Sequence, residues 1–223
     1  MTIVIWDGKT LTSDRRQTRS GGLNEIMGKY VSVNKVFDLR NIKPRSCAVI
    51  KDMPENAIWS RVIAISYTGV DDQIKAFHGF LLEMLKEKID VMDDIRNWVR
   101  FSPTYLEFSF ILVVQNSITK EYGIYTLKRY DVSRNFKSYF TTVNDSFYAI
   151  GSGASIVNQW HKRQCNLSPV EYIYLAALHV DSCGDGYMQL DLNKTKIKTS
   201  KTYPLIVKNK LLTIFKSKIL NIK

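Results

Sequence analysis

The order in which two kinds of hydrophobic periodicity follow one another constrains the fold of this 223-residue chain more than any single motif does. Period-two alternation, typical of β-strands, fills the first third, and helical spacing of apolar residues replaces it at 72–89 and 93–101. Strand and helix patterns then follow in further blocks, over 105–115, 121–130, 146–164, 167–180 and 187–192. Strands in blocks separated by paired helices favour antiparallel sheets between helical layers over alternating βα units. We therefore expect an α+β fold, a four-layer αββα sandwich of two antiparallel sheets between helices.

Local signals predict where several elements begin and end. Asp7-Gly8 separates two short apolar runs and predicts a hairpin, because this dipeptide tolerates the positive φ angles of tight turns. Ser168, Pro169 and Glu171 together predict a helix N-terminus with a capping box. Period-two patterns at 30–39 and 46–50 predict further strands.

A net charge of +11 is concentrated at the end of the chain. Residues 194–223 contain nine lysines and no acidic residue, so the rest carries about +2. These lysines are interleaved with Leu, Ile and Phe, as in a packed strand or an amphipathic helix with a cationic side. We expect a domain over 1–193 and a Lys-rich extension over 194–223. A solvated charged face explains the lysines; an acidic protein, nucleic acid or membrane partner is the alternative.

The sequence contains no pattern that predicts a metal or a cofactor. The cysteines are widely spaced and form no C-x-x-C pair, so buried reduced thiols are expected at Cys47, Cys165 and Cys183. The histidines fall in three separate predicted helices, which favours structural roles for His78, His161 and His179. No apolar run reaches 18 residues and no signal peptide is visible, so we expect no transmembrane segment and a cytoplasmic location.

Several scattered residues follow one another in an order that is typical of one enzyme family. They are Thr2 behind the initiator methionine, Asp14, Arg16 and Thr18, the pair Lys35-Val36, Gly69 before Asp72, Ser152 in an Ala-Ile-Gly-Ser-Gly string, and Asp181. On these residues the chain resembles, over about 1–192, the proteasome family of N-terminal nucleophile (Ntn) hydrolases. The resemblance is particularly to the HslV-type bacterial peptidases and their phage relatives. The Ala-Ile-Gly-Ser-Gly string is the most specific local match.

The resemblance implies a threonine peptidase or another amide hydrolase. Removal of Met1 would free the α-amine of Thr2, whose pKa of about 7.7–8.0 suits it as the base for its own hydroxyl. By the same resemblance, Lys35 would lie beside that hydroxyl and lower its pKa. Asp14 would pair with the lysine and orient it.

The resemblance also implies supporting roles and an assembly. Ser152 and Asp181 would support the amine and a bound water, and the Gly69 N–H would face the developing oxyanion. Relatives assemble into rings, so we expect a homo-oligomer that acts on a peptide or amide substrate, in the host cytoplasm if the protein is phage-encoded.

Two positions depart from the family pattern. Relatives commonly begin Met-Thr-Thr-Ile-Val, whereas this chain begins Met1-Thr2-Ile3, so a gapless alignment places Met1 where the nucleophile should be. Gly184 stands where many relatives have Ser or Thr. The alternative is therefore a catalytically degenerate proteasome-fold protein that acts as a binding or inhibitory module through its basic C-terminal segment. A nucleic-acid-binding module, with affinity that falls steeply with salt, is a third interpretation.

Overall fold

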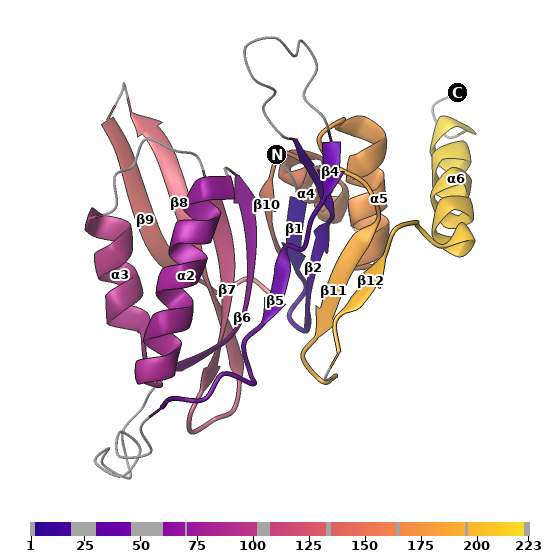
Figure 1. Cartoon of the computed structure of the whole chain (residues 1–223). Helices are drawn as coiled ribbons and strands as arrows, with labels where there is room; N and C mark the ends of the chain where they lie inside the picture. Colours follow the sequence, from indigo (N-terminus) through magenta and orange to yellow (C-terminus); the bar gives the residue numbers. More distant parts are fainter. Residues whose placement is uncertain are drawn as a thin grey trace. The chain divides into compact units, whose positions relative to one another are not determined.

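The chain forms two compact units, each with its own antiparallel sheet. The computed structural model describes residues 3–18, 30–45, 60–69, 71–101, 108–132, 135–163, 166–194 and 196–220. Unit 1 combines Met1–Val36 with Phe147–Lys223, and unit 2 is the intervening Phe37–Ser146 (Figure 1). The described part of each unit contains a five-stranded sheet together with helices. The prediction of an α+β fold with two antiparallel sheets is confirmed.

The sheet of unit 1 has the strand order β10-β1-β2-β11-β12, and all neighbouring strands are antiparallel. Its strands are β1 (Ile3–Trp6), β2 (Thr10–Asp14), β10 (Tyr148–Gly151), β11 (Tyr187–Asp191) and β12 (Lys198–Ser200). The predicted hairpin joins β1 to β2: Gly8 has a φ of 86°, and Asp7 Oδ1 accepts hydrogen bonds from the N–H groups of Lys9 and Thr10. Two short strands, β3 (Arg16–Thr18) and β4 (Tyr30–Ser32), form a separate antiparallel pair.

The structure corrects the prediction of one continuous strand over 30–39. β4 ends at Ser32, and β5 (Val36–Asp38) belongs to a different sheet. In the gap, the Val33 N–H donates to the Arg15 carbonyl at 2.9 Å, and Lys35 is buried. A buried ammonium group needs a partner, and the break in the strand lets the Lys35 side chain turn toward β2 to reach one. The strand predicted at 46–50 lies outside the described residues.

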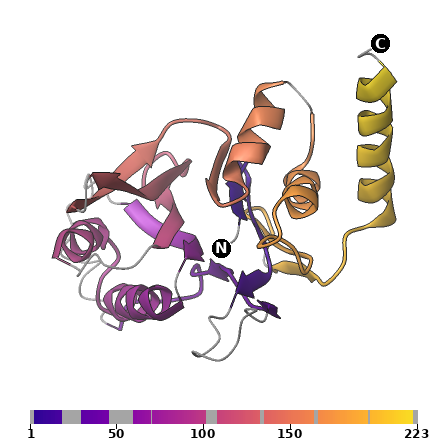
Figure 2. The ribbon, with the colours of Figure 1, turned by 90° about the horizontal axis from the view of Figure 1, so that it is seen from above.

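Two helices pack on one face of the unit 1 sheet, α4 (Ala154–Lys162) and α5 (Pro169–His179). Their apolar residues share a buried cluster with Ile3 and Ile5 of β1. Figure 2 shows the two helices beside this sheet. α5 begins as predicted, since Ser168 Oγ accepts from the Glu171 N–H and Glu171 Oε2 accepts from the Ser168 N–H. The capping box therefore fixes the start of the helix that covers β1.

The Lys-rich segment contains β12 and a C-terminal helix, α6 (Leu205–Leu220). α6 contributes Val207 and Leu211 to apolar clusters with α5. Lys210 Nζ lies 2.9 Å from the Glu171 carboxylate and 3.3 Å from the carbonyl oxygen of Asn166. These contacts attach α6 to the N-terminal end of α5. Among the helices of the described ranges, none is both long and apolar enough to cross a membrane.

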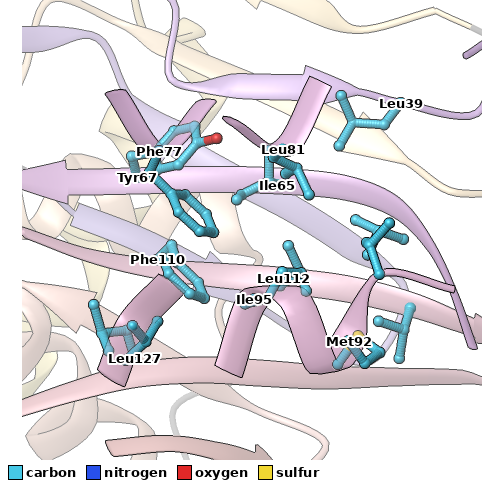
Figure 3. Close-up of a cluster of buried hydrophobic side chains, with 14 of the residues drawn as sticks. Leu39, Ile65, Tyr67, Phe77, Leu81, Met92, Ile95, Phe110, Leu112 and Leu127 are labelled. Atoms are coloured by element: carbon cyan, nitrogen blue, oxygen red, sulfur yellow. The ribbon is translucent and has the colours of Figure 1, made fainter. Parts of the chain in front are cut away.

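The sheet of unit 2 has the order β5-β6-β7-β8-β9, with α2 (Asp71–Glu87) and α3 (Met92–Phe101) packed on it. Its other strands are β6 (Ser60–Gly69), β7 (Phe108–Asn116), β8 (Tyr122–Val132) and β9 (Asn135–Val143). Helix and strand side chains meet in one core, where the Phe77 and Phe110 rings stack at 4.7 Å (Figure 3). The helix predicted at 72–89 is confirmed to within two residues of each end.

Gly186 allows a direct test of the unit 1 fold. Its φ is 83°, and a Cβ added there would overlap the carbonyl oxygen of Ser200. We expect Gly186→Ala to lower the free energy of unfolding by roughly 2–4 kcal/mol in urea titrations, through backbone strain and overlap. The control is Gly79→Ala in α2, where an added Cβ meets no atom within 4 Å. A comparable loss in both variants would contradict this assignment.

The contact between α5 and α6 predicts an acid-sensitive part of the stability. Burial raises the pKa of Glu171, but hydrogen bonds from Lys210 and Ser168 and the charge of Lys210 outweigh burial and hold that pKa below its ordinary 4.5. The resulting stabilisation is complete above pH 4.5 and is lost as the pH falls through the folded-state pKa. We expect Lys210→Gln to lose less stability than the unmodified protein between pH 7 and about pH 3.5. The exposed Lys201→Gln should leave the pH dependence of urea unfolding unchanged.

Candidate functional site

A buried ion pair joins the end of β2 to the residue before β5. Lys35 Nζ lies 3.0 Å from Asp14 Oδ1, and the two side chains are 7% and 0% exposed. The same ammonium group donates to the carbonyl oxygen of Arg16, and the Lys35 backbone N–H contacts Met188 Sδ at 3.4 Å. Both ends of the lysine are therefore anchored in unit 1.

The Asp14 carboxylate accepts two further hydrogen bonds, from N–H groups in separate parts of the chain. Oδ1 accepts the backbone N–H of Ile3 at 3.0 Å, and Oδ2 accepts the backbone N–H of Gly184 at 3.0 Å. Asp14 reaches both because β2 lies between β1 and β11, opposite Tyr187 in the β11 register. Since the Ile3 nitrogen belongs to the peptide bond with residue 2, the carboxylate is fixed beside the start of the chain.

Burial sets the electrostatics of this pair. It lowers the pKa of the Lys35 amine, and the attraction of Asp14 acts against that shift. It raises the pKa of the Asp14 carboxyl, against which the charge of Lys35 and the N–H groups of Ile3 and Gly184 act. Both shifts bring the proton affinities of the two groups closer together. A lysine in this setting gives up its proton more readily than an exposed one, and such perturbed pairs are typical of reactive sites.

The turn at 181–186 packs against the ion pair and has an unusual backbone. Positive φ angles occur at Gly184 (142°), Asp185 (57°) and Gly186 (83°). The Gly184 carbonyl accepts the N–H groups of Arg15 and Arg16 at 3.0 and 3.1 Å, while its own N–H points to Asp14. A side chain at Gly184 would meet the Arg16 guanidinium at 3.0 Å. The positive φ and the nearby guanidinium explain why glycine occupies this position, where the family pattern favours Ser or Thr.

Arg16 holds the far side of the same turn. Its Nε and Nη2 lie 3.2 and 3.0 Å from Asp185 Oδ1, and its Nη1 donates to the Asp181 carbonyl at 2.7 Å. Asp181 contributes its backbone oxygen to this contact, and its side chain is exposed. The arginine therefore ties the turn to the strand segment that follows Asp14.

Ser152 lies at the end of β10, between two glycines with distinct roles. Gly151 has a φ of 99°, and a Cβ at Gly153 would approach Ala176 to 2.9 Å and Cys183 to 3.1 Å. The first glycine allows the chain to leave the strand. The second allows the start of α4 to pack closely on α5. Backbone conformation and helix packing therefore explain both glycines of the Ala-Ile-Gly-Ser-Gly string.

Ser152 is also in contact with the 181–186 turn. Its Oγ lies 3.0 Å from Ser182 Oγ and 3.8 Å from Cys183 Sγ. Burial raises the pKa of the Cys183 thiol to about 11, so this thiol is protonated at neutral pH and is a poor nucleophile. Cys183 is buried, as expected for a structural thiol; Cys47 and Cys165 lie outside the described residues.

The remaining candidates from the sequence fall elsewhere. Gly69 ends β6 in unit 2, with a φ of 119° and Phe108 as its strand partner. Thr18 lies in β3, opposite Tyr30. Thr2 lies outside the described residues. The oxyanion role of Gly69 and the nucleophilic role of Thr2 stay predictions.

The described residues contain no metal-binding cluster, in the sense of three or more His, Cys, Asp or Glu side chains grouped together. Two histidines instead make aromatic contacts. His161 stacks on Phe147 with ring centroids 3.8 Å apart, and His78 Nδ1 lies 3.0 Å from the Tyr67 hydroxyl. These contacts are the kind expected of structural histidines.

Sequence reasoning missed four contributors to this region: Ser182, Cys183, the Gly184 N–H and Asp185. The signal that could have identified them is the density of turn-forming residues in Asp-Ser-Cys-Gly-Asp-Gly, which is unusual for a simple helix-to-strand connection. Every residue except proline has a backbone N–H, so the hydrogen bond from the Gly184 N–H to Asp14 could be identified only in the folded structure.

Neither a scan against protein-family models nor a search of the curated proteins finds a match to this chain. Among solved structures, the chain is similar to the crystal structure of eukaryotic HslV from Trypanosoma brucei, with a TM-score of 0.43 and 13% sequence identity. The similarity covers 85% of this chain and 97% of the HslV chain.

The ion pair predicts a specific double-mutant result. Lys35→Met leaves the Asp14 carboxylate buried without its cation, so we expect a loss of about 3–5 kcal/mol in the free energy of unfolding. Adding Asp14→Asn removes that buried charge and should recover part of the loss, as measured by urea titration. The control is Lys86→Met, which breaks an exposed pair with Glu83 within α2 and should not change the stability measurably. Purely additive effects of the two substitutions would show that the residues are not coupled.

Proposed function

We propose that this protein is an N-terminal nucleophile hydrolase that cleaves peptide or other amide bonds, with Thr2 as nucleophile after removal of Met1. The observation that supports it most is the Asp14–Lys35 pair, fixed by a hydrogen bond to the peptide nitrogen of Ile3. That nitrogen directly follows Thr2 in the chain. A buried cation and its counter-ion thus stand next to the segment that would supply the nucleophile.

The reaction needs a nucleophile, a base and a site for negative charge. In the proposed reaction the Thr2 hydroxyl attacks the substrate carbonyl carbon while its proton passes to the free α-amine. The ammonium group of Lys35 favours the developing alkoxide through its positive charge, and Asp14 keeps the lysine in place. The tetrahedral oxyanion accepts a hydrogen bond, for which Gly69 is our candidate donor.

Collapse of the tetrahedral intermediate completes the first half of the reaction. The carbon–nitrogen bond breaks, the leaving amine takes the proton from the Thr2 ammonium, and an ester to the threonine remains. Water, activated by the same α-amine, then hydrolyses the ester. In this proposal Ser152 and Asp181 orient the amine and that water; the Ser152 hydroxyl is held 3.0 Å from the Ser182 hydroxyl.

One observation favours a second candidate, a catalytically degenerate protein that works by binding. Val4 lies opposite Ser13 in the β1–β2 register, so Ile3 and Asp14 share the other face of the sheet. In a regular strand, the residue two positions before Ile3 would share that face, and in this sequence it is Met1. The two candidate functions therefore differ in which residue must occupy the position of the nucleophile: Thr2 directly before Ile3, or a residue two positions before it. Under the second candidate, the basic C-terminal segment carries the binding or inhibitory role.

The family resemblance also leads us to propose a homo-oligomer. Sedimentation velocity of the full-length protein at several concentrations tests this directly. A single species of 25.8 kDa at all concentrations would contradict the proposal.

The first candidate predicts both processing and turnover. Intact-mass analysis of protein produced in cells should show that Met1 is absent, and a panel of fluorogenic peptides should then be hydrolysed. We expect Lys35→Ala to reduce kcat by about 100-fold or more, since it removes the proposed cation at the nucleophile. The control Lys9→Ala changes an exposed lysine in the β1–β2 turn and should retain full activity. Retained Met1 with no turnover in any substrate would overturn the proposal.

A register variant distinguishes the two candidates. Inserting one threonine between Met1 and Thr2 moves a threonine to the position two residues before Ile3. If the natural chain is inactive and the insertion variant hydrolyses peptides, the register of the first strand is what makes the natural protein degenerate. If the natural chain is active and the insertion abolishes activity, the first candidate stands.

A further inference from the structure

The C-terminal helix α6 has one apolar stripe that the fold covers. Val207 and Leu211 are 7% and 1% exposed, and Ile214 packs against the same clusters with α5. These residues are spaced by four and three positions, which places them on one side of the helix. This stripe accounts for the attachment of α6 to α5.

The same helix has further apolar side chains that stay exposed in the described part of unit 1. Leu205, Ile206 and Leu212 are 70%, 77% and 56% exposed. Leu205 lies about 200° around the helix from Val207, and Leu212 is seven positions from Leu205, on the same side. Figures 1 and 2 both show α6 on the far side of α5 from β1 and β2, and no helix or strand among the described residues of unit 1 lies on its outer side. Large aliphatic side chains are thus presented outward.

Lysines surround these exposed side chains. Residues 194–223 have nine lysines and no acidic residue. Lys196 and Lys201 are exposed in the approach to α6, and Lys208 and Lys210 follow within its first two turns. Of these, Lys210 is paired with Glu171. The outer side of α6 therefore combines exposed aliphatic groups with positive charge.

From this combination we infer that the outer face of α6, defined by Leu205, Ile206 and Leu212 with Lys201 and Lys208, docks on an anionic lipid surface. An anionic bilayer supplies both complements: negative headgroups for the lysines and an apolar layer just below them for the aliphatic side chains. The helix would lie in the plane of the interface, with its inner stripe still packed on α5. This inference is independent of the hydrolase proposal.

Two other partners fit the surface less well. A second copy that met this face through its own 194–223 segment would bring like charges together, because the segment has no acidic residue. Nucleic acid would use the lysines but leave the aliphatic groups without a complement, since unpaired bases are held by aromatic or arginine stacking. The segment has no arginine and only two aromatic residues, Tyr203 and Phe215, and the Tyr203 hydroxyl donates to the Gly186 carbonyl at 3.0 Å.

Co-sedimentation of the full-length protein with lipid vesicles tests the inference. We expect binding to phosphatidylcholine vesicles that contain phosphatidylserine, and much weaker binding to phosphatidylcholine alone. The triple variant Leu205→Ser, Ile206→Ser, Leu212→Ser should reduce the partition coefficient by about tenfold or more, because it removes the inserted apolar groups. Lys201→Gln and Lys208→Gln should each reduce it by about fivefold on anionic vesicles only.

The matched control is Leu178→Ser, which replaces another exposed leucine of unit 1, 50% exposed near the end of α5. It should leave vesicle binding unchanged, and circular dichroism should show that every variant is folded. Absence of binding to anionic vesicles would overturn the inference, as would equal losses in Leu178→Ser and the triple variant. Duplex DNA binding that survives the triple variant, or a dimer that the triple variant dissociates without any vesicle binding, would identify the other partners and also overturn it.

Discussion

The buried carboxylate of Asp14 is the constraint on which the rest of unit 1 depends. A charge without solvent contact must be matched by a cation and by hydrogen-bond donors, or the group cannot stay ionised in the interior. Asp14 obtains these from three places that are distant in sequence: the amine of Lys35 and the N–H groups of Ile3 and Gly184. Each donor holds a different segment in position. Satisfying one carboxylate therefore fixes the start of β1, the break between β4 and β5, and the turn before β11.

The turn at 181–186 extends this constraint to the C-terminal part of the chain. Gly186 adopts a positive φ and lies against the backbone of Ser200 in β12, while its carbonyl accepts the Tyr203 hydroxyl. Tyr203 in turn packs near Tyr187 and Tyr174. The segment that leads into α6 is thus built onto the same turn that supplies an N–H group to Asp14.

A site of this kind has a cost in stability that the surrounding packing offsets. Desolvation shifts both the lysine and the aspartate away from their ordinary pKa values, which is unfavourable for the charged forms. The apolar cluster of β1 with α4 and α5 supplies the compensating burial, with Ile3 and Ile5 fully covered. β1, which follows residues 1 and 2, is therefore held by its packing against α4 and α5.

The sequence by itself determined the elements whose signals are local. Turn chemistry and periodicity within a few residues predict the Asp7-Gly8 hairpin, the capping box of Ser168 and Glu171, and helix α2. It also placed Asp14 and Lys35 among the candidate residues, through a resemblance in their order. The same resemblance led us to expect that they pair, and the tertiary structure shows how two side chains 21 positions apart along the chain come into contact. Only the tertiary structure decided that the Gly184 N–H completes the site and that α6 leaves apolar side chains exposed. Both features depend on contacts between residues far apart in the sequence. A backbone N–H donor cannot be recognised from the type of residue that carries it. When a helix has two apolar sides, its sequence does not determine which of them the rest of the protein covers.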